Sequence, residues 1–233
     1  MQRDEFLARV KQAAAAGRAY QVALNPLATA EQSYVGGGDD PVATFLTEWR
    51  AVGGFGDRFT QIDELLACVS KVLSQHSVRS VLTWRQSLLE KLGVGPWLAA
   101  RGIEVLYWDD LEKLPVDRCR ELSFAAHMGL TGVDWAVAET GSLAVCARPG
   151  GQGRSCSLLP PLHIAIFSSR QLVPDLFDLF EVLGVEARDA GLPSNVTLIT
   201  GPSKTGDIQL KLTTGVHGPG EVHALILDEG PAA

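Results

Sequence analysis

A series of short apolar runs, separated by segments with helical periodicity, is the feature that most constrains the fold. The runs have strand length and occupy residues 80–84, 102–108, 133–140, 142–149, 162–168, 195–200 and 221–228. Several are nearly continuous in apolar residues, which is typical of strands buried on both faces. Because helical patterns separate several of these runs, we expect βαβ units. The sequence therefore predicts an α/β fold with a largely parallel sheet and helices on both faces.

Local signals place several helix boundaries. One helix is expected within ATFLTEWRAVG, and a capping box in TQID, from Thr60, would begin the next. The helix that contains DRCRELSFAAHMG is expected to end on Gly129. Pro174 is expected in the first turn of the helix PDLFDLFEVLG, where its missing N–H costs nothing.

The N-terminal region predicts a helical arm that precedes the domain. In residues 4–15, Phe6, Leu7, Val10 and Ala14 fall on one helical face, and the polar, glycine-containing stretch AEQSYVGGGDD follows. We therefore expect an arm and linker over 1–41 and an α/β domain over 42–229. The sequence leaves open whether the arm docks partner proteins or packs on its own domain.

Charge and hydropathy restrict the compartment and the partners. Lys and Arg total 20 against 27 Asp and Glu, a formal net charge of −7, which disfavours nucleic-acid binding through a basic face. The start MQRDEFLARVKQ lacks the apolar core of a signal peptide, and no stretch reaches the ~18 apolar residues of a membrane span. We expect a cytoplasmic protein with no membrane insertion.

The four cysteines are widely spaced. Cys68, Cys119, Cys146 and Cys156 form no CxxC pair and no C-x₂-C-x₂-C run of the kind that holds an iron–sulfur cluster. The pattern implies no structural disulfide, and we expect no cofactor bound by this chain alone.

Three polar, glycine-bearing segments follow predicted strands: residues 138–142, 148–163 and 200–207. In open α/β sheets, ligands bind outside the carboxyl ends of the strands. Glycine lets other groups approach the main chain closely, although it costs conformational entropy on folding. We therefore expect the three segments to converge on a ligand site, the alternative being glycine-rich loops that only connect strands.

Two of these segments, ETGS and GPSKTGD, present the donors that an anion requires. Turns of successive amides bind carboxylates or phosphates, and a lysine adds a positive charge. The spacing is not that of a Walker A loop. The residues that we expect to bind an anionic ligand are Thr140, Gly141, Ser142, Gly201, Ser203, Lys204, Thr205 and Asp207.

Glu139 and His217 are the candidate catalytic residues. The carboxylate of Glu139 should emerge at a strand end beside a turn, where it would either touch a ligand or accept N–H bonds within its own turn. His217 stands between glycine-rich turns and would exchange protons near neutral pH. The spacing of His217, Glu221 and His223 matches no trusted metal site, so no metal is expected. His163 and His223 begin or lie on apolar strands and are interpreted as structural.

The ordered set VDWAVAETGSLAV, SLLPPLHIAIF and ITGPSKTGDIQLKLTTGVHGPGEVHALIL resembles the LutC/YkgG family, the lactate-utilisation protein C group with the LUD domain. The resemblance covers roughly residues 42–229 and implies a fold like that of NagB, RpiA and the CoA-transferases. It also implies a component of an L-lactate utilisation system, which supports oxidation of L-lactate to pyruvate with partner proteins that carry iron–sulfur clusters. Related CoA-transferases use a glutamate near a strand-end glycine as nucleophile, but ETGS departs from their glutamate–asparagine–glycine turn.

Other functions stay open at this point. A stand-alone enzyme like a CoA-transferase or a formyltetrahydrofolate cyclo-ligase, or a ligand-binding protein for an anionic small molecule, would also fit the residues. No G-x-G-x-x-G follows the early strands to support a nicotinamide site. Whether the chain is itself catalytic is not decided by the sequence.

Overall fold

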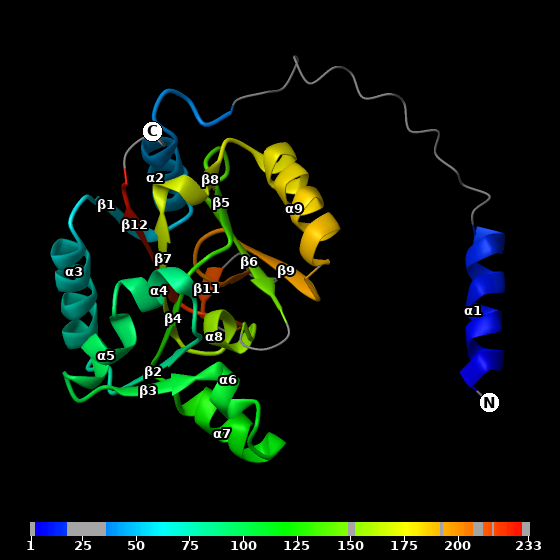
Figure 1. The fold of residues 1–233 in the computed structure, drawn as a ribbon, viewed down its shortest axis with the longest axis horizontal. Coiled ribbons are helices and arrows are strands. Elements are labelled where there is room, and N and C mark those ends of the chain that lie inside the picture. The colour runs from blue at the N-terminus through cyan, green and yellow to red at the C-terminus, as the bar shows by residue number, and fades with distance from the viewer. Residues whose placement is uncertain are drawn as a thin grey trace. The chain divides into compact units, whose positions relative to one another are not determined.

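The computed structural model describes residues 3–17, 36–148, 152–191, 193–206, 212–215 and 217–229 (Figure 1). It divides into two compact units, Met1–Tyr34 and Val35–Ala233. The first unit contains helix α1 (Arg3–Gly17), on which Phe6, Leu7 and Val10 are exposed. The second unit contains all the described strands.

The larger sheet of the second unit has six strands, and every neighbouring pair is parallel. Its order is β1 (Phe55–Phe59), β12 (Glu221–Leu227), β7 (Leu162–Ser168), β4 (Met128–Thr131), β2 (Ser80–Thr83) and β3 (Glu104–Tyr107). Every residue of β7, β4 and β2 is buried. The apolar runs at 80–84 and 162–168 thus correspond to strands covered on both faces.

Two helices cover opposite faces of this sheet near β1. Gly56 faces helix α2 (Pro41–Ala51), because an added Cβ would lie 3.0 Å from Leu46. Its neighbours Phe55 and Asp57 line a cavity with residues of helix α3 (Ile62–Gln75), a cavity that Gly56 and Arg50 also border. Successive side chains of a strand point to opposite faces, so α2 and α3 lie on opposite sides of the sheet. The predicted fold class is confirmed.

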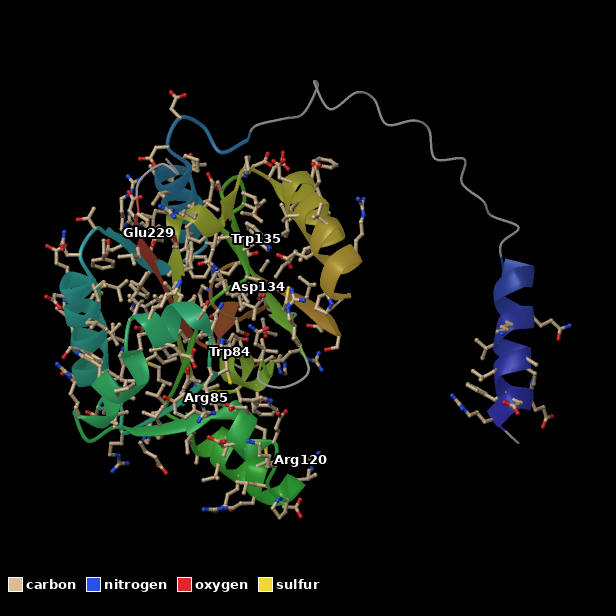
Figure 2. The ribbon with its side chains drawn as sticks, in the orientation of Figure 1. Trp84, Arg85, Arg120, Asp134, Trp135 and Glu229 are labelled. Atoms are coloured by element: carbon tan, nitrogen blue, oxygen red, sulfur yellow. The ribbon has the colours of Figure 1, made fainter. Side chains whose placement is uncertain are left out.

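The smaller sheet has the order β8 (Leu172–Val173), β5 (Trp135–Val137), β6 (Ser142–Ala147) and β9 (Asn195–Ile199). Strand β6 is antiparallel to both of its neighbours, whereas β5 and β8 are parallel. Helix α9 (Leu176–Ala190) packs on this sheet, and the indole N–H of Trp135 donates to Glu186 of α9 over 2.9 Å (Figure 2). A short hairpin, β10 (Lys204–Gly206) and β11 (Leu212–Thr214), follows.

The remaining elements are short and connect the strands. They are α4 (Ser87–Lys91), α5 (Val94–Ala99), α6 (Trp108–Leu111), α7 (Val116–Ala125), α8 (Ser155–Leu158) and the 3₁₀ turn η2 (Ser169–Gln171). Within the described ranges, no helix combines the length and the apolar character needed to cross a bilayer.

The predicted helix end at Gly129 is wrong. Helix α7 ends at Ala125, Ala126 is already extended with ψ 130°, and residues 128–131 form strand β4 between β2 and β7. Met128 and Leu130 are completely buried there, so tertiary packing overrides the local helical pattern. An added Cβ on Gly129 would lie 1.9 Å from the carbonyl oxygen of Cys156, which explains why glycine occupies this strand.

Two predicted helix starts also need correction. The N-cap of α3 is Gln61, and no side-chain hydrogen bond caps that helix, so the TQID capping box does not form. In α9 the N-cap is Asp175, whose carboxylate accepts from the N–H groups of Phe177 and Asp178. Pro174 therefore precedes the cap and lies outside the first turn. Aspartate is a favoured N-cap residue, and one carboxylate oxygen of Asp175 accepts both N–H bonds, so the helix begins at Leu176, two residues after Pro174.

His163 lies on β7 within the core and is completely buried. Its Nε2 is 2.9 Å from Thr131 Oγ1, and its Nδ1 has no hydrogen-bond partner. Burial, together with the charge of the nearby His223, lowers the pKa of His163 to about 3. The imidazole is therefore neutral in the folded chain at neutral pH.

This burial predicts a pH-dependent stability. The pKa of His163 falls from 6.5 to about 3 on folding, so below pH 6.5 the unfolded chain binds more protons. The contribution of His163 to the free energy of unfolding is fully present above pH 6.5. As the pH falls below that value, this contribution is lost at up to ~1.4 kcal/mol per pH unit. Urea unfolding should show that wild type loses about 2 kcal/mol more than His163→Gln between pH 7 and pH 5. Equal losses in the two proteins would show that His163 is protonated in the fold.

Candidate functional site

Two of the predicted segments, ETGS and GPSKTG, pack against the C-terminal end of α2. Gly141, in the turn between β5 and β6, has φ +57°, and an added Cβ would lie 2.4 Å from the main-chain nitrogen of Trp49. Gly201 has φ +82°, and its Cβ would lie 2.8 Å from Cγ2 of Val52. Both positions require a left-handed backbone and a close approach to α2, two conditions that glycine meets best. The glycines therefore bring ETGS and GPSKTG against one helix end.

Hydrogen bonds connect these segments to one another. The hydroxyls of Ser142 and Thr200 are 2.8 Å apart, and the hydroxyl of Thr140 donates to Ser142. The N–H of Ser203 donates to Pro219 over 2.9 Å, and the N–H of Gly220 donates to Pro161 over 2.9 Å. The structure thus brings together residues of 138–142, 148–163 and 200–207, with 215–220 in addition.

The position of the segments relative to the sheets differs from expectation. They follow the carboxyl ends of β5, β6 and β9, which belong to the smaller sheet. Segment 148–163 leads instead to the amino end of β7 in the six-stranded parallel sheet, and segment 200–207 runs into the β10–β11 hairpin that precedes β12. The reason is topological: the chain returns from the smaller sheet to the larger one through these loops. The prediction that these segments lie at the carboxyl ends of strands therefore holds only for the smaller sheet.

Several donors of GPSKTG are used within the protein. The ammonium of Lys204 donates to the carbonyl oxygen of Val52 at the end of α2, where a cation also complements the helix dipole. Ser203 accepts from the N–H of Gly215 over 2.9 Å, in addition to its own bond to Pro219. Thr205 lies in the β10–β11 hairpin opposite Thr213. These contacts hold the loop in place, and anion binding by the segment stays a prediction.

The remaining predicted site residues are Glu139, His217 and Asp207. Glu139 is half-buried, and its N–H donates to the carbonyl oxygen of Pro174 over 3.0 Å. His217 is exposed. Asp207 lies outside the described residues. The catalytic roles of Glu139 and His217 and the binding role of Asp207 stay predictions.

A cavity of about 900 Å³ adjoins the end of α2, at the amino ends of β1 and β12. Gly53 and Gly54 border it, and the Lys204 ammonium would lie 3.4 Å from a Cβ added to Gly53. Helix α3 lines the opposite wall with Cys68 and Lys71 among others, and His217 does not line it. We call this space the histidine cavity.

Three titratable side chains form its most distinctive group. Nε2 of His76 and Nε2 of His223 lie 3.0 and 2.7 Å from the same carboxylate oxygen, Oε1 of Glu221. The ring of Phe55 stacks on His223, with centroids 5.1 Å apart and planes inclined by 21°. An ionised carboxylate only accepts, so each histidine donates from Nε2 and keeps Nδ1 for another partner.

The positively charged side chains that line the cavity differ in whether they already form an ion pair. The guanidinium of Arg50 donates to the carbonyl oxygen of Gly56 over 2.6 Å and pairs with Asp57 at 3.0 Å. Among the ion pairs of the described residues, none involves Lys71, which is exposed on α3. Burial and the charge of Asp57 raise the pKa of Cys68, so its thiol stays protonated. The cation available to a ligand anion is therefore the Lys71 ammonium, which lines the same cavity as the two histidines.

Sequence reasoning missed His76, Arg50 and Lys71. It weighed His217 with Glu221 and His223, whereas the residue that joins this pair is His76, 145 positions from Glu221 in the chain. Residues 68, 71 and 75 recur at helical spacing and all line the cavity, which is the one signal that the sequence offered. In the part of the chain that the structure describes, no three His, Cys, Asp or Glu side chains are placed to hold a metal ion.

The fold and the site define an α/β protein with a parallel six-stranded sheet and a cavity at the amino ends of the adjacent strands β1 and β12. The LUD domain family matches residues 42–227. The chain belongs to this family.

Curated relatives carry one recurring name. A lactate utilization protein C from Halalkalibacterium halodurans is 35% identical over 161 residues, which is 69% of this chain and 67% of that protein. A second from Shouchella clausii is 28% identical over 173 residues, 73% of each chain. The crystal structure of a DUF162 family protein from Deinococcus radiodurans has a TM-score of 0.56 at 21% identity, covering 80% of this chain and 95% of that one. That likeness shows the fold.

The close approach at Gly201 leads to a stability prediction. Gly93 has a similar φ of +63° but nothing within 4 Å of an added Cβ, so Gly93→Ala isolates the backbone strain, about 1–2 kcal/mol. Gly201→Ala adds a clash with Val52 and should cost about 1–3 kcal/mol more in free energy of unfolding. Urea denaturation measures both. Equal losses would show that the contact between the loop and α2 is not tight.

Proposed function

We propose that this chain is a component of an L-lactate utilisation system and supports oxidation of L-lactate to pyruvate together with iron–sulfur proteins. The match of the LUD domain family over residues 42–227 carries the proposal. Relatives named lactate utilization protein C, each aligned over about two thirds or more of both chains, support the lactate system. The proposal places the chain in the cytoplasm.

The chemistry divides between this chain and its partners. Oxidation of L-lactate breaks the C2–H and O–H bonds, forms the ketone of pyruvate and releases two electrons and two protons. The electrons pass to clusters on the partner proteins. Burial raises the pKa of Cys146 to about 12 and raises that of Cys156 as well, and both side chains are completely buried. Protonated, enclosed thiols are poor cluster ligands, which supports a chain that carries no cluster itself.

The histidine cavity supplies what a small 2-hydroxy acid requires. A charge-assisted hydrogen bond from Lys71 would hold the carboxylate of lactate. The imidazoles of His76 and His223, held by Glu221, would accept the hydroxyl proton. The role of this chain is then to bind the substrate and to take up the hydroxyl proton, while the two electrons and the proton from C2 pass to the partners.

Growth of the organism that encodes this chain tests the proposal. A strain without the chain should fail to grow on L-lactate and grow normally on pyruvate, the product. Wild type should restore growth. Lys71→Ala and His223→Asn should restore it poorly, since each removes a proposed ligand contact worth roughly tenfold or more in affinity.

The matched control is Lys91→Ala, which removes an exposed lysine that does not line the histidine cavity. It should restore growth like wild type. Normal growth of the deletion strain on L-lactate would refute the lactate role. If both cavity variants restored growth fully, the chain would still act in lactate utilisation, but the histidine cavity would not be its substrate site.

A further inference from the structure

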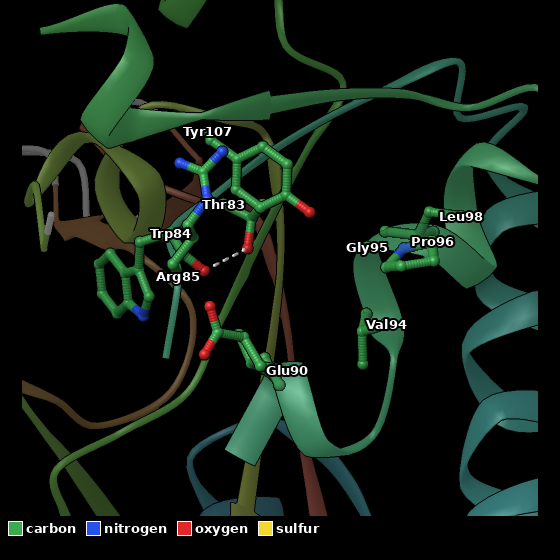
Figure 3. A pocket seen from close by; sticks show the side chains of 10 residues that line it. Thr83, Trp84, Arg85, Glu90, Val94, Gly95, Pro96, Leu98 and Tyr107 are labelled. Carbon is green, nitrogen blue, oxygen red and sulfur yellow. Dashed lines mark hydrogen bonds between the residues drawn. The ribbon is translucent and has the colours of Figure 1, made fainter. Parts of the chain in front are cut away.

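A second cavity, of about 260 Å³, lies at the carboxyl ends of β2 and β3 (Figure 3). Thr83 and Trp84 at the end of β2, Tyr107 at the end of β3, and residues of α4 and α5 surround it. Ligands of open α/β sheets bind at this edge. The histidine cavity lies at the amino ends of β1 and β12, so the two cavities lie at opposite edges of the sheet.

The cavity has an apolar wall of fixed shape. Leu89, Val94 and Leu98 line it, and each is at most 4% exposed. The phenol of Tyr107 lies against Gly95, because a Cβ added there would be 1.9 Å from the phenol oxygen. Only glycine at this position leaves room for the ring. This wall would bury a small hydrocarbon group.

Three acceptor groups face the same space. The carboxylate of Glu90 points toward the end of β2 at Thr83 and Trp84, and the hydroxyl of Tyr107, which lies against Gly95, lines the same cavity (Figure 3). The hydroxyl of Thr83 makes one long bond, 3.4 Å, to the carbonyl oxygen of Trp84. Among the ion pairs of the described residues, none involves Glu90. Its negative charge therefore lacks a cation.

The neighbouring charges do not supply that cation. Arg85 lies 4.1 Å over the Tyr107 ring and pairs with both Asp109 and Asp110, the latter at 2.9 Å. Lys113 also pairs with Asp110, at 3.2 Å. The two positive charges of Arg85 and Lys113 are balanced by the two carboxylates of Asp109 and Asp110. The charge of Glu90 is therefore left without a counter-charge in this group. Arg85 also lines the cavity, but its charge is already paired, so the lining carboxylate without an ion-pair partner among the described residues is that of exposed Glu90.

We propose that this cavity binds a small primary ammonium ion with an apolar body. An ammonium group has three N–H donors, which match the carboxylate of Glu90 and the hydroxyls of Thr83 and Tyr107. Its carbon chain would contact Leu89, Val94 and Leu98. The inference is independent of the proposed function, since it rests on other residues at the other edge of the sheet.

Three probes with the same carbon chain and different head groups test it: butylammonium, 1-butanol and butyrate. Each is titrated into the full chain at pH 7 while NMR follows the amides of residues 83–98. Butylammonium should bind most tightly, and butyrate at least about tenfold more weakly. Glu90→Gln should weaken butylammonium about threefold or more, as expected for a partly exposed pair, and leave butanol unchanged.

Glu112→Gln is the matched control, because Glu112 is an exposed carboxylate that does not line the cavity. It should bind all three probes like wild type. Tighter binding of butyrate, no response to butylammonium, or equal butylammonium affinity in Glu90→Gln and wild type would each overturn the proposal. None of these outcomes bears on growth on L-lactate.

Discussion

The packing of Trp49 at the end of α2 is the contact on which the rest of the structure depends. The indole is completely buried, and its N–H donates to the carbonyl oxygen of Phe55 over 2.7 Å. A Cβ on Gly54 would lie 2.3 Å from Trp49 Nε1, and Gly141 approaches the main chain of the same residue. Large aromatic side chains contribute much of a core's stability, and here glycines leave the space that one of them fills. The larger sheet and the turn of the smaller sheet therefore meet at one helix end.

This contact also determines where chemistry is possible. Once Gly201 and Lys204 are held at Val52, the loop cannot move away from the end of α2, and Gly53 becomes the border of the histidine cavity. His76 comes from the end of α3 and His223 from β12, so their shared carboxylate, Glu221, bridges two elements. A cluster assembled from distant segments depends on the packing beneath it for its geometry.

The parts of the fold that the sequence predicted are those with a local signal. The continuous apolar runs predicted four of the six parallel strands, β2, β3, β7 and β12, and the glycines of GPSKTG predicted a constrained loop. Strand β1 was missed because it is an edge strand, where exposed Asp57 and Arg58 interrupt the apolar pattern. Strand β4 was missed because its four residues follow a helix directly and only their neighbours β2 and β7 make them a strand.

The site was predicted less completely than the fold, for a related reason. Glu221 and His223 are two residues apart on one strand and attract attention together, but their partner His76 is far away in the sequence. No local pattern encodes which helix end faces which strand. Lys204 was expected to face a ligand, and the structure shows its ammonium bonded to Val52. A loop that looks like a binding site in sequence can thus serve to position its neighbours.

The most direct test is an NMR titration of the purified full chain with L-lactate. The account predicts saturable shifts of the Gly53 and Gly54 amides and of the His223 ring, and affinity about tenfold lower in Lys71→Ala. Shifts absent from the histidine cavity at saturating lactate, or unchanged affinity in Lys71→Ala, would contradict it.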